Sequence, residues 1–500
     1  MGDIGFAIGQ IPPAAADVLQ GRAAFTTHPK IFLGTFIHSR SLTELEYLHN
    51  AAVAVDAEGL IVAIEKDLDL STPSLTRSAA HSLLSKLNWD DSSSSVEITS
   101  TNPSKSQFFF PGFIDTHLHA SQYPNVGIFG NSTLLDWLNT YTFPLEASLQ
   151  DQAKARKVYT RVIRKTLSHG TTTAAYYATI DVPSTNLLAD LCLSFGQRAL
   201  VGRVCMDQLG PDYYLDASPE DSLAATEATI AHCRKIDPSF GLVKPIITPR
   251  FAPACSAPLM KSLGELAAAT NLPIQTHISE NVNEIALVKS LFPWQEIGAR
   301  DDSYAAVYDA FGLLTEKTIL AHAVHLTEDE ASLVAERKAK VSHCPCSNSA
   351  ITSGAAKVRW LLERGIPTGL GTDMSGGYSP SVLEAARHAV LVSRHLAMPD
   401  AGGEEKDKLS VEEVLFLATR GGAEVVDMKG RVGGFEVGME WDAQLIGLGE
   451  EEEEEEEDQG NVDVFGWENW EEKVAKWVYN GDDRNTKKVW VKGRLVHQRK

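Results

Sequence analysis

The fold is decided by a stretch that reads Phe108-Phe109-Phe110-Pro111-Gly112-Phe113-Ile114-Asp115-Thr116-His117-Leu118-His119. Its apolar residues predict a buried strand. His117 and His119 lie two positions apart, so in a strand their side chains point to the same face. Two imidazoles at the end of a buried strand can hold one metal ion. We therefore predict a metal site here, with further ligands supplied by later strands.

Strand-like and helical segments alternate after residue 107. Eight apolar strand candidates recur, at residues 108–115, 171–177, 199–206, 242–248, 273–277, 318–322, 340–343 and 367–372. Strands that alternate with helices predict a parallel sheet, and eight such units favour a (β/α)8 TIM-type barrel. A doubly wound open sheet is the alternative. It is disfavoured because no Gly-x-Gly-x-x-Gly motif follows the first strand.

Both ends of the chain carry short strand patterns with turn residues between them. Residues 51–64 predict one hairpin and residues 488–496 another, with its turn at Gly493. We therefore predict an α/β protein in which a small composite β-sandwich domain is built from residues 1–107 and 430–500. The barrel, residues 108–429, is inserted between these two parts.

Composition limits the classes of function. The chain has 500 residues, 43% hydrophobic and 22% charged, as is typical of soluble globular proteins. The formal net charge of −21 would repel a phosphate backbone, so no nucleic-acid partner is expected. Part of that charge lies in the carboxylate run 450–458, which we interpret as a solvated loop rather than an interaction tail.

The sequence also predicts a cytosolic location. No apolar run is long enough to cross a bilayer, so no membrane partner is expected, and the first 16 residues do not resemble a secretory signal. Six cysteines are too few for a disulfide framework in a chain of this length. Cys344 and Cys346 have no second pair to complete a structural zinc site, which favours buried, reduced thiols.

Polar side chains follow four of the predicted strands, where a barrel places its active residues. These side chains are His117, His119, His277, Glu280, His322 and Asp373. Taken singly they have simpler explanations. Asp373 is also typical of a helix N-cap, and Glu280 is also typical of a carboxylate at the start of a helix. Taken together, imidazole and carboxylate ligands in this order favour a catalytic zinc site.

This ordered set resembles the amidohydrolase superfamily of metal-dependent hydrolases. The resemblance rests on residues 111–119, His277, His322 and Asp373. A closer resemblance, to the guanine deaminase family, begins near residue 30 and continues to the C-terminus. Its motifs are His119-Ala120-Ser121-Gln122-Tyr123, Pro249-Arg250-Phe251, His277-Ile278-Ser279-Glu280 and Tyr479-Asn480-Gly481-Asp482-Asp483-Arg484-Asn485.

The resemblance implies hydrolysis of guanine to xanthine and ammonia, in purine catabolism or salvage. His117, His119, His277 and Asp373 would bind one Zn²⁺ per chain, and the metal would activate a water as the nucleophile. Asp373 would accept the proton of that water.

Two further catalytic residues are implied by the same resemblance. Glu280 would protonate N3 of the purine ring and then the leaving amine. His322 would orient the nucleophile and stabilise the tetrahedral intermediate.

Substrate binding is implied for Gln122, Arg250 and Phe251, with His277 and His322 also facing the substrate. Arg250 is a forked donor suited to a carbonyl oxygen, and Gln122 offers both a donor and an acceptor. Their simpler explanations are a surface salt bridge for Arg250 and a solvated loop side chain for Gln122. Phe251 is nearly as typical of a core residue as of a ring that stacks on a purine.

Two other functions fit parts of the pattern. The same metal chemistry would serve another aminopurine, a triazine or a pterin. A metal-free scaffold that uses the acidic run as its contact is the alternative from another class. The ligand types also accept iron or manganese in place of zinc. The resemblance further implies a homodimer. The other zinc deaminase design is excluded because the sequence has no His-x-Glu motif.

Overall fold

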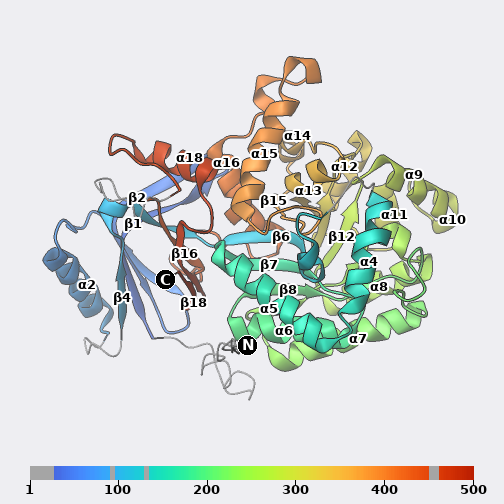
Figure 1. Cartoon of the computed structure of the whole chain (residues 1–500), viewed down its shortest axis with the longest axis horizontal. Coiled ribbons are helices and arrows are strands. Elements are labelled where there is room, and N and C mark those ends of the chain that lie inside the picture. The colour runs from blue at the N-terminus through green and yellow to red at the C-terminus, as the bar shows by residue number, and fades with distance from the viewer. Residues whose placement is uncertain (1–27, 90–95, 129–133, 450–460, 500) are drawn as a thin grey trace, which may run out of the picture.

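The computed structural model of the chain describes residues 28–89, 96–128, 134–449 and 461–499. The first 16 residues, the Asp/Ser-rich segment 90–95 and the acidic run 450–458 lie outside the described residues. Figure 1 shows two parts side by side, a sheet formed by both chain ends and a larger part in which strands and helices alternate. In the described part of the chain, every helix is too short or too polar to cross a membrane.

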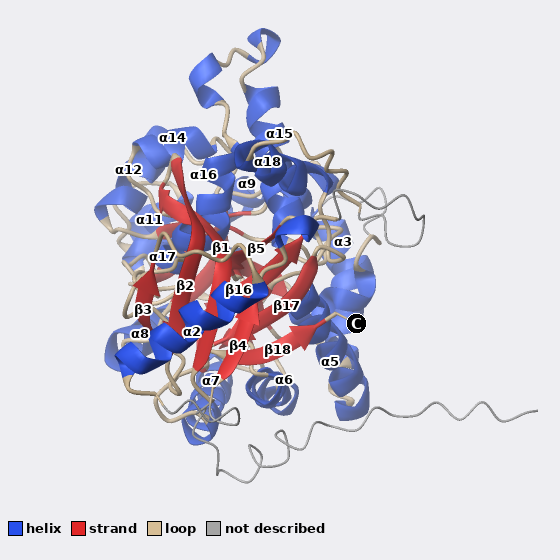
Figure 2. Ribbon diagram, turned by 90° about the vertical axis from the view of Figure 1, so that its left-hand side faces the viewer, coloured by secondary structure: helices blue, strands red, loops and turns tan. Residues whose placement is uncertain are grey.

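The strands from the two chain ends form one eight-stranded sheet, in the order β18-β17-β16-β5-β1-β2-β3, with β4 paired to β1. Helix α2 (Pro73–Leu87) lies across one face of it (Figure 2). The strands are β1 (Lys30–Ser41), β2 (Glu44–Val55), β3 (Ile61–Glu65), β4 (Glu97–Ser100), β5 (Gln107–Pro111), β16 (Ala443–Gly447), β17 (Thr486–Val491) and β18 (Arg494–Gln498). The predicted pairings β2–β3 and β17–β18 are both antiparallel hairpins. The sequence analysis did not predict α2.

The stretch 108–119 contains two strands, β5 and β6, whereas the sequence analysis expected one strand across residues 108–115. β5 pairs with β16 in the end sheet, and β6 (Phe113–His119) starts the parallel strands. The break falls at Gly112, whose N–H donates to the carbonyl of Asp442 at 2.9 Å. A Cβ at this position would lie 2.2 Å from the side chain of Thr172, so only glycine permits this close approach. Residues 108–110 are therefore core of the end sheet.

The parallel strands form two four-stranded sheets. The first has the order β10-β8-β7-β6 and the second the order β12-β13-β14-β15. Besides β6, they comprise β7 (Thr171–Tyr177), β8 (Arg198–Gly202), β10 (Val243–Pro245), β12 (Ile274–Ile278), β13 (Thr318–His322), β14 (Lys340–His343) and β15 (Thr368–Leu370). Each of these eight strands overlaps one of the eight predicted segments, although β6, β8 and β12 extend beyond the predicted bounds. A two-stranded sheet, β9 (Val204–Cys205) with β11 (Thr248–Pro249), extends the first one.

Backbone contacts join the two parallel sheets at both edges. On one side, parallel bridges pair Ile247 with Ile274 and Phe251 with His277. On the other, the N–H of Asp373, just after β15, donates to the carbonyl of His117 at 2.9 Å. The N–H of His119 likewise donates to Met374. The C-terminal ends of β6, β12, β13 and β15 are thereby brought close together.

Helices connect the parallel strands and cover them. Several begin at a Ser or Asp whose side chain accepts a backbone N–H, as Asp181, Ser218 and Ser256 do. The helices are α3 (Leu134–Trp137), α4 (Phe143–Ser148), α5 (Gln152–Ser168), α6 (Val182–Phe195), α7 (Pro219–Ile236), α8 (Ala257–Thr270), α9 (Val282–Leu291), α10 (Trp294–Ile297), α11 (Tyr304–Ala310), α12 (Glu328–Glu336), α13 (Pro345–Ala350), α14 (Val358–Glu363), α15 (Val382–Leu396), α16 (Val411–Phe416), α17 (Gly422–Val425) and α18 (Trp470–Asn480).

A buried ion pair ties the two parts of the molecule together. Arg198 of β8 donates from Nε and Nη2 to both carboxylate oxygens of Asp442, at 3.1 and 3.0 Å, and also contacts Glu440. Arg198 and Asp442 are both essentially inaccessible to solvent. Removing one partner of such a pair costs about 3–5 kcal/mol of stability. All six cysteines are buried free thiols, as the sequence analysis predicted for Cys344 and Cys346.

Candidate active site

Three elements bring the four predicted metal ligands together. His117 and His119 end β6, His277 lies in β12, and Asp373 follows β15. Oδ1 of Asp373 lies 3.2 Å from Nε2 of His117 and 3.4 Å from Nε2 of His119. The Nε2 atoms of His119 and His277 are 3.3 Å apart. Side chains that lie far apart in the sequence therefore point their ligand atoms at one small volume.

The state of the imidazoles fits a cation in that volume. Burial lowers the pKa of His117, His119 and His277, so these rings are neutral and offer lone pairs. Nδ1 of His277 lies 2.6 Å from the carbonyl of Arg250, to which it can only donate, so its Nε2 carries the lone pair. Nε2 of His117 lies 3.2 Å from Oδ1 of Asp373 but makes no hydrogen bond of acceptable geometry with any described residue. A divalent metal would satisfy these groups.

The carboxylate of Asp373 is set up as an anion. Burial alone would raise its pKa, but the neighbouring imidazoles, His117 first, outweigh burial and lower the pKa. The backbone of Asp373 is left-handed, with φ of 44°. This conformation is uncommon for a residue with a side chain and is typical of functional sites. Asp373 does not cap a helix, because the next one, α15, is capped by Ser381.

A buried carboxylate behind the metal ligands fixes their backbone. Oδ1 of Asp115 accepts the N–H of His117 at 3.3 Å and that of Thr372 at 3.0 Å, and Oδ2 accepts the Thr372 hydroxyl at 2.6 Å. Gly371 lies so close that a Cβ there would be 2.9 Å from Cβ of His117. β6 and the loop after β15 are thus joined directly beneath the site.

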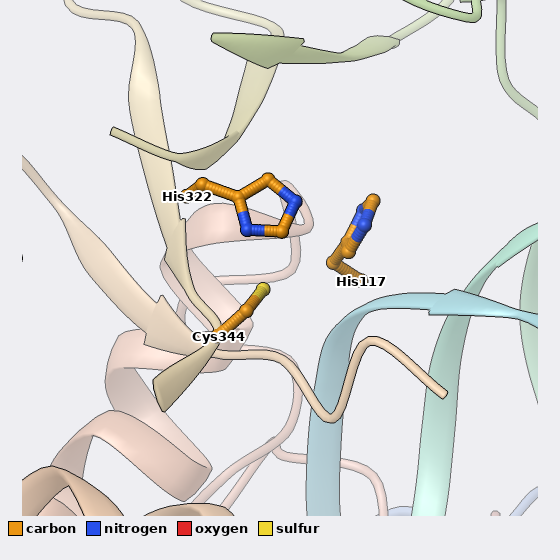
Figure 3. A group of neighbouring side chains, drawn as sticks. All are labelled: His117, His322 and Cys344. Atoms are coloured by element: carbon orange, nitrogen blue, oxygen red, sulfur yellow. The ribbon is translucent and has the colours of Figure 1, made fainter. Parts of the chain in front are cut away.

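Figure 3 shows a second group of possible ligands, His117, His322 and Cys344, whose side chains point toward one another. One ligand atom of each lies within 4.8 Å of the others. Burial raises the pKa of the Cys344 thiol well above its usual range, and the sulfur lies 3.6 Å from the carbonyl of Ser342. A neutral thiol is a poor ligand. The histidine and Asp373 set therefore fits a metal better.

His322 and Glu280 form a pair beside the metal ligands. Nε2 of His322 lies 3.5 Å from Oε2 of Glu280 and 3.8 Å from Oδ2 of Asp373. Nδ1 of His322 lies 2.9 Å from Oδ1 of Asn348, which only accepts, so this nitrogen carries the proton. Burial opposes a charge on His322, but Glu280 and Asp373 outweigh it and raise its pKa.

Glu280 is poised for proton transfer. Burial, reinforced by the charge of Asp373, raises the pKa of this carboxyl to about 7. A carboxyl that titrates near neutral pH can both give and take a proton. Glu280 stands one residue before Asn281, the N-cap of α9, and it is Glu284 that completes the capping box there. The side chain of Glu280 therefore faces His322 instead of serving the helix.

A second cluster of polar residues lies beside the metal ligands, and its centre is Glu146 of α4. Arg250 donates from Nη1 and Nη2 to the two carboxylate oxygens, at 2.8 and 3.3 Å. Gln122 donates from Nε2 at 2.8 Å, and Tyr214 from its hydroxyl at 2.6 Å. Arg250 is therefore not in a surface salt bridge, and Gln122, only 1% exposed, is not solvated.

Both clusters contribute residues to one pocket. Its lining residues are His119, Gln122, Leu134, Trp137, Leu138, Arg250, Phe251, His277, Glu280, His322, Ser347, Ile351, Asp373 and Gly376. Phe251 is thus both a core residue and part of the lining. The sequence analysis missed Glu146, Tyr214 and Trp137, because none of them lies at the end of a parallel strand of the two four-stranded sheets. No motif in the sequence pointed to them.

A family model for the amidohydrolase family matches residues 108–496. The chain belongs to this family. Its relatives within the family include a probable guanine deaminase of Schizosaccharomyces pombe, 48% identical over 466 residues, which are 93% of this chain and 83% of that protein. They also include the guanine deaminase of Homo sapiens, 40% identical over 468 residues, which are 93% of this chain and 96% of that protein.

Solved structures show the same likeness in three dimensions. The guanine deaminase of C. acetobutylicum, with guanine bound in its active site, superposes with a TM-score of 0.80 at 33% identity. The match covers 94% of this chain and 100% of that one. The sequence and structure comparisons therefore both find guanine deaminases as relatives of this chain.

Proposed function

We propose that this chain hydrolyses guanine to xanthine and ammonia. The observation that carries the proposal is the agreement between site and relatives. One pocket is lined both by the proposed metal ligands and by the buried side chains of Arg250 and Gln122. The chain that carries it is 48% identical to a probable guanine deaminase. In the reaction, a bond forms between a water oxygen and C2 of the purine, the bond from C2 to its amine breaks, and the amine leaves as ammonia.

His117, His119, His277 and Asp373 would hold the metal, which we propose to be one Zn²⁺ per chain. Three imidazole nitrogens and a carboxylate oxygen are a donor set that zinc favours. When bound, the ion would supply the Lewis acidity that makes water a nucleophile near neutral pH. The alternative that the chain is a metal-free scaffold is disfavoured, because all four proposed ligands are present and converge on one small volume.

Three side chains would move protons or orient groups in the reaction. Asp373, ionised and aimed at the ligand volume, accepts a proton from the attacking water. Glu280, with a pKa of about 7, protonates N3 of the ring, takes up the proton of the new C2 hydroxyl and passes it to the departing amine. The proton held by Asp373 then returns to Glu280, which restores both groups. Nε2 of His322 faces Glu280 and Asp373, so His322 orients the nucleophile and stabilises the charge that develops on its oxygen.

Recognition of the purine falls to the other side of the cavity. Arg250 offers N–H donors and Gln122 offers an amide, both buried and held by Glu146. Phe251 supplies an apolar wall, and His277 and His322 close the cavity on the metal side. Buried polar groups of this kind select a substrate, because a ring that leaves them unpaired binds poorly.

The order of the parallel strands supports a closed (β/α)8 barrel. Hydrogen bonds run from β6 through β10, bridge to β12, continue to β15 and return from Asp373 to His117. We propose this barrel for residues 108–429, flanked by a composite β-sandwich from residues 1–107 and 430–500. A homodimer and a cytosolic location stay predictions, which sedimentation and cell fractionation would test.

Initial rates on a panel of bases test the proposal. Ammonia release from guanine should exceed that from adenine, cytosine, a pterin and an aminotriazine by at least about 100-fold, because the buried donors fit only one ring edge. Equal turnover of guanine and adenine would refute guanine as the substrate. Fast turnover of a triazine or pterin instead would favour the alternative ring classes.

A further inference from the structure

We propose that Glu146 is a specificity-determining residue that does not itself contact the substrate. It fixes Gln122 as a hydrogen-bond acceptor and Arg250 as a donor toward the cavity, so that the pair selects a ring edge in which a carbonyl adjoins an N–H. The inference rests on the proposed function and deepens it, because guanine carries such an edge at N1 and O6.

The position of Glu146 separates it from the substrate. It lies in α4, and its side chain is completely buried. Four polar hydrogens converge on its two oxygens, from Arg250 twice, from Gln122 and from Tyr214. Gln122 and Arg250 line the cavity, and Glu146 does not. The carboxylate thus stands behind the two residues that a ligand would meet.

The polarity of Gln122 follows from this contact. An ionised carboxylate only accepts hydrogen bonds, so the amide of Gln122 must turn its NH₂ group toward Glu146. Its Oε1 atom then faces away from Glu146, where the Ser375 hydroxyl is a distant donor at 3.5 Å. An amide oxygen has two lone pairs, so Gln122 retains acceptor capacity. With a neutral partner in place of Glu146, the amide would be free to turn over.

Arg250 is held just as firmly. Two of its N–H groups are engaged by Glu146, and the ring of Phe143 lies 5.1 Å from the guanidinium carbon. Five N–H donors on a rigid fork leave others free for a ligand. Because a buried guanidinium needs a counter-charge, Glu146 also permits Arg250 to stay charged inside the protein. The charge of Glu146 therefore holds both Gln122 and Arg250 in the orientation that substrate recognition needs.

An acceptor beside a cationic donor complements a lactam edge, in which N–H adjoins C=O. Guanine has this edge. 2,6-Diaminopurine carries the same amine at C2, but its N1 is an acceptor and its C6 bears a donor amine. Every hydrogen bond that guanine forms with the pair would then become a clash of like groups. Selection against a ring of this kind is strong, because it leaves buried polar groups unpaired.

The test compares Glu146→Gln with the wild-type enzyme on guanine and on 2,6-diaminopurine. Glutamine keeps the shape of the side chain and removes its charge. We expect the ratio of kcat/KM for guanine to kcat/KM for 2,6-diaminopurine to fall by at least about 30-fold. Most of the change should lie in KM for guanine, and the metal content should not change. A ratio within about 3-fold of wild type would overturn the proposal.

Asp442→Asn is the matched control. It neutralises another buried carboxylate that binds an arginine, Arg198, through two oxygens, but it lies outside the cavity. This variant should lower the melting temperature and leave the substrate ratio unchanged. If the control shifted the ratio as much as Glu146→Gln, general loosening of the fold would explain both results, and the role of Glu146 would be refuted.

Tyr214→Phe keeps the test decisive if Glu146→Gln does not fold. It removes one donor to Glu146 and leaves the charge in place. We expect a smaller fall in the same ratio, about 3- to 10-fold, and an unchanged ratio would count against the proposal. Failure of the proposed function looks different, since wild-type protein would then not deaminate guanine at all.

Discussion

The two ends of the cavity differ in how fully their polar groups are satisfied. At the metal end, where His117, His119, His277 and Asp373 converge, Nε2 of His117 makes no hydrogen bond of acceptable geometry with any described residue. The Nε2 atoms of His119 and His277 lie 3.3 Å apart. At the recognition end, the carboxylate of Glu146 accepts four hydrogen bonds. Buried polar groups are costly unless they are paired. We therefore expect a bound cation to complete the metal end, whereas the polar groups of the recognition end are already held in place by Glu146.

Removing the metal gives the largest expected effect and tests this contrast directly. Treatment with a chelator, or the variant His277→Ala, should reduce turnover to less than about 1% of wild type, because no nucleophile forms at neutral pH without the metal. Zinc should restore the treated wild-type protein and not the variant. The checks are metal content by elemental analysis and the rate of ammonia release.

The recognition end should survive that treatment. The ion pair between Arg250 and Glu146 contains no metal ligand, so guanine should still bind to the metal-free protein, although more weakly. Calorimetric titration with guanine measures this. Full activity in protein shown to be free of metal would contradict the assignment of the histidines and favour a different chemistry.

Glu280→Gln should give the next largest effect and sharpen the boundary between the two ends. The variant keeps the size of the side chain but cannot shuttle a proton, so kcat should fall by about 10²- to 10⁴-fold. Metal content should not change, because Glu280 is not among the proposed ligands. Steady-state rates with elemental analysis decide the matter, and near-normal kcat would remove Glu280 from the mechanism.

The convergence of the proposed metal ligands was predictable from the sequence, and the reason is geometric. Parallel strands bring their last residues to the same edge of a sheet. The positions of His117, His277 and Asp373 at the ends of apolar runs therefore indicate that their side chains lie close together. Glu146 gives no such signal, since it lies in a six-residue helix between parallel strands. Only the fold places it against Arg250. The break at Gly112 was missed for a related reason, because a Pro-Gly pair inside an apolar run leaves the strand count open.

Arg250→Lys tests the recognition end with a smaller effect. Lysine keeps the positive charge near Glu146 but loses the planar fork that engages two oxygens. We expect kcat/KM for guanine to fall by about 10- to 100-fold, chiefly through KM, with little change in metal content. Arg250 also accepts the proton of His277 Nδ1 through its backbone, which the substitution preserves. A large loss of metal would show that the two ends are not separable.

Asn348→Ala should give the smallest effect and probes the link between His322 and the metal end. Oδ1 of Asn348 accepts the Nδ1 proton of His322, which leaves Nε2 directed at Glu280 and Asp373. Without this acceptor the ring loses its preferred tautomer and orientation, and groups of this kind are worth about 10- to 100-fold in activity. We expect a loss of about 10-fold in kcat with KM nearly constant. Asn348→Asp restores an acceptor at the same place, so rescue of kcat by this variant would support orientation of His322 as the cause. A rise in KM for guanine with kcat unchanged would instead assign Asn348 to substrate recognition.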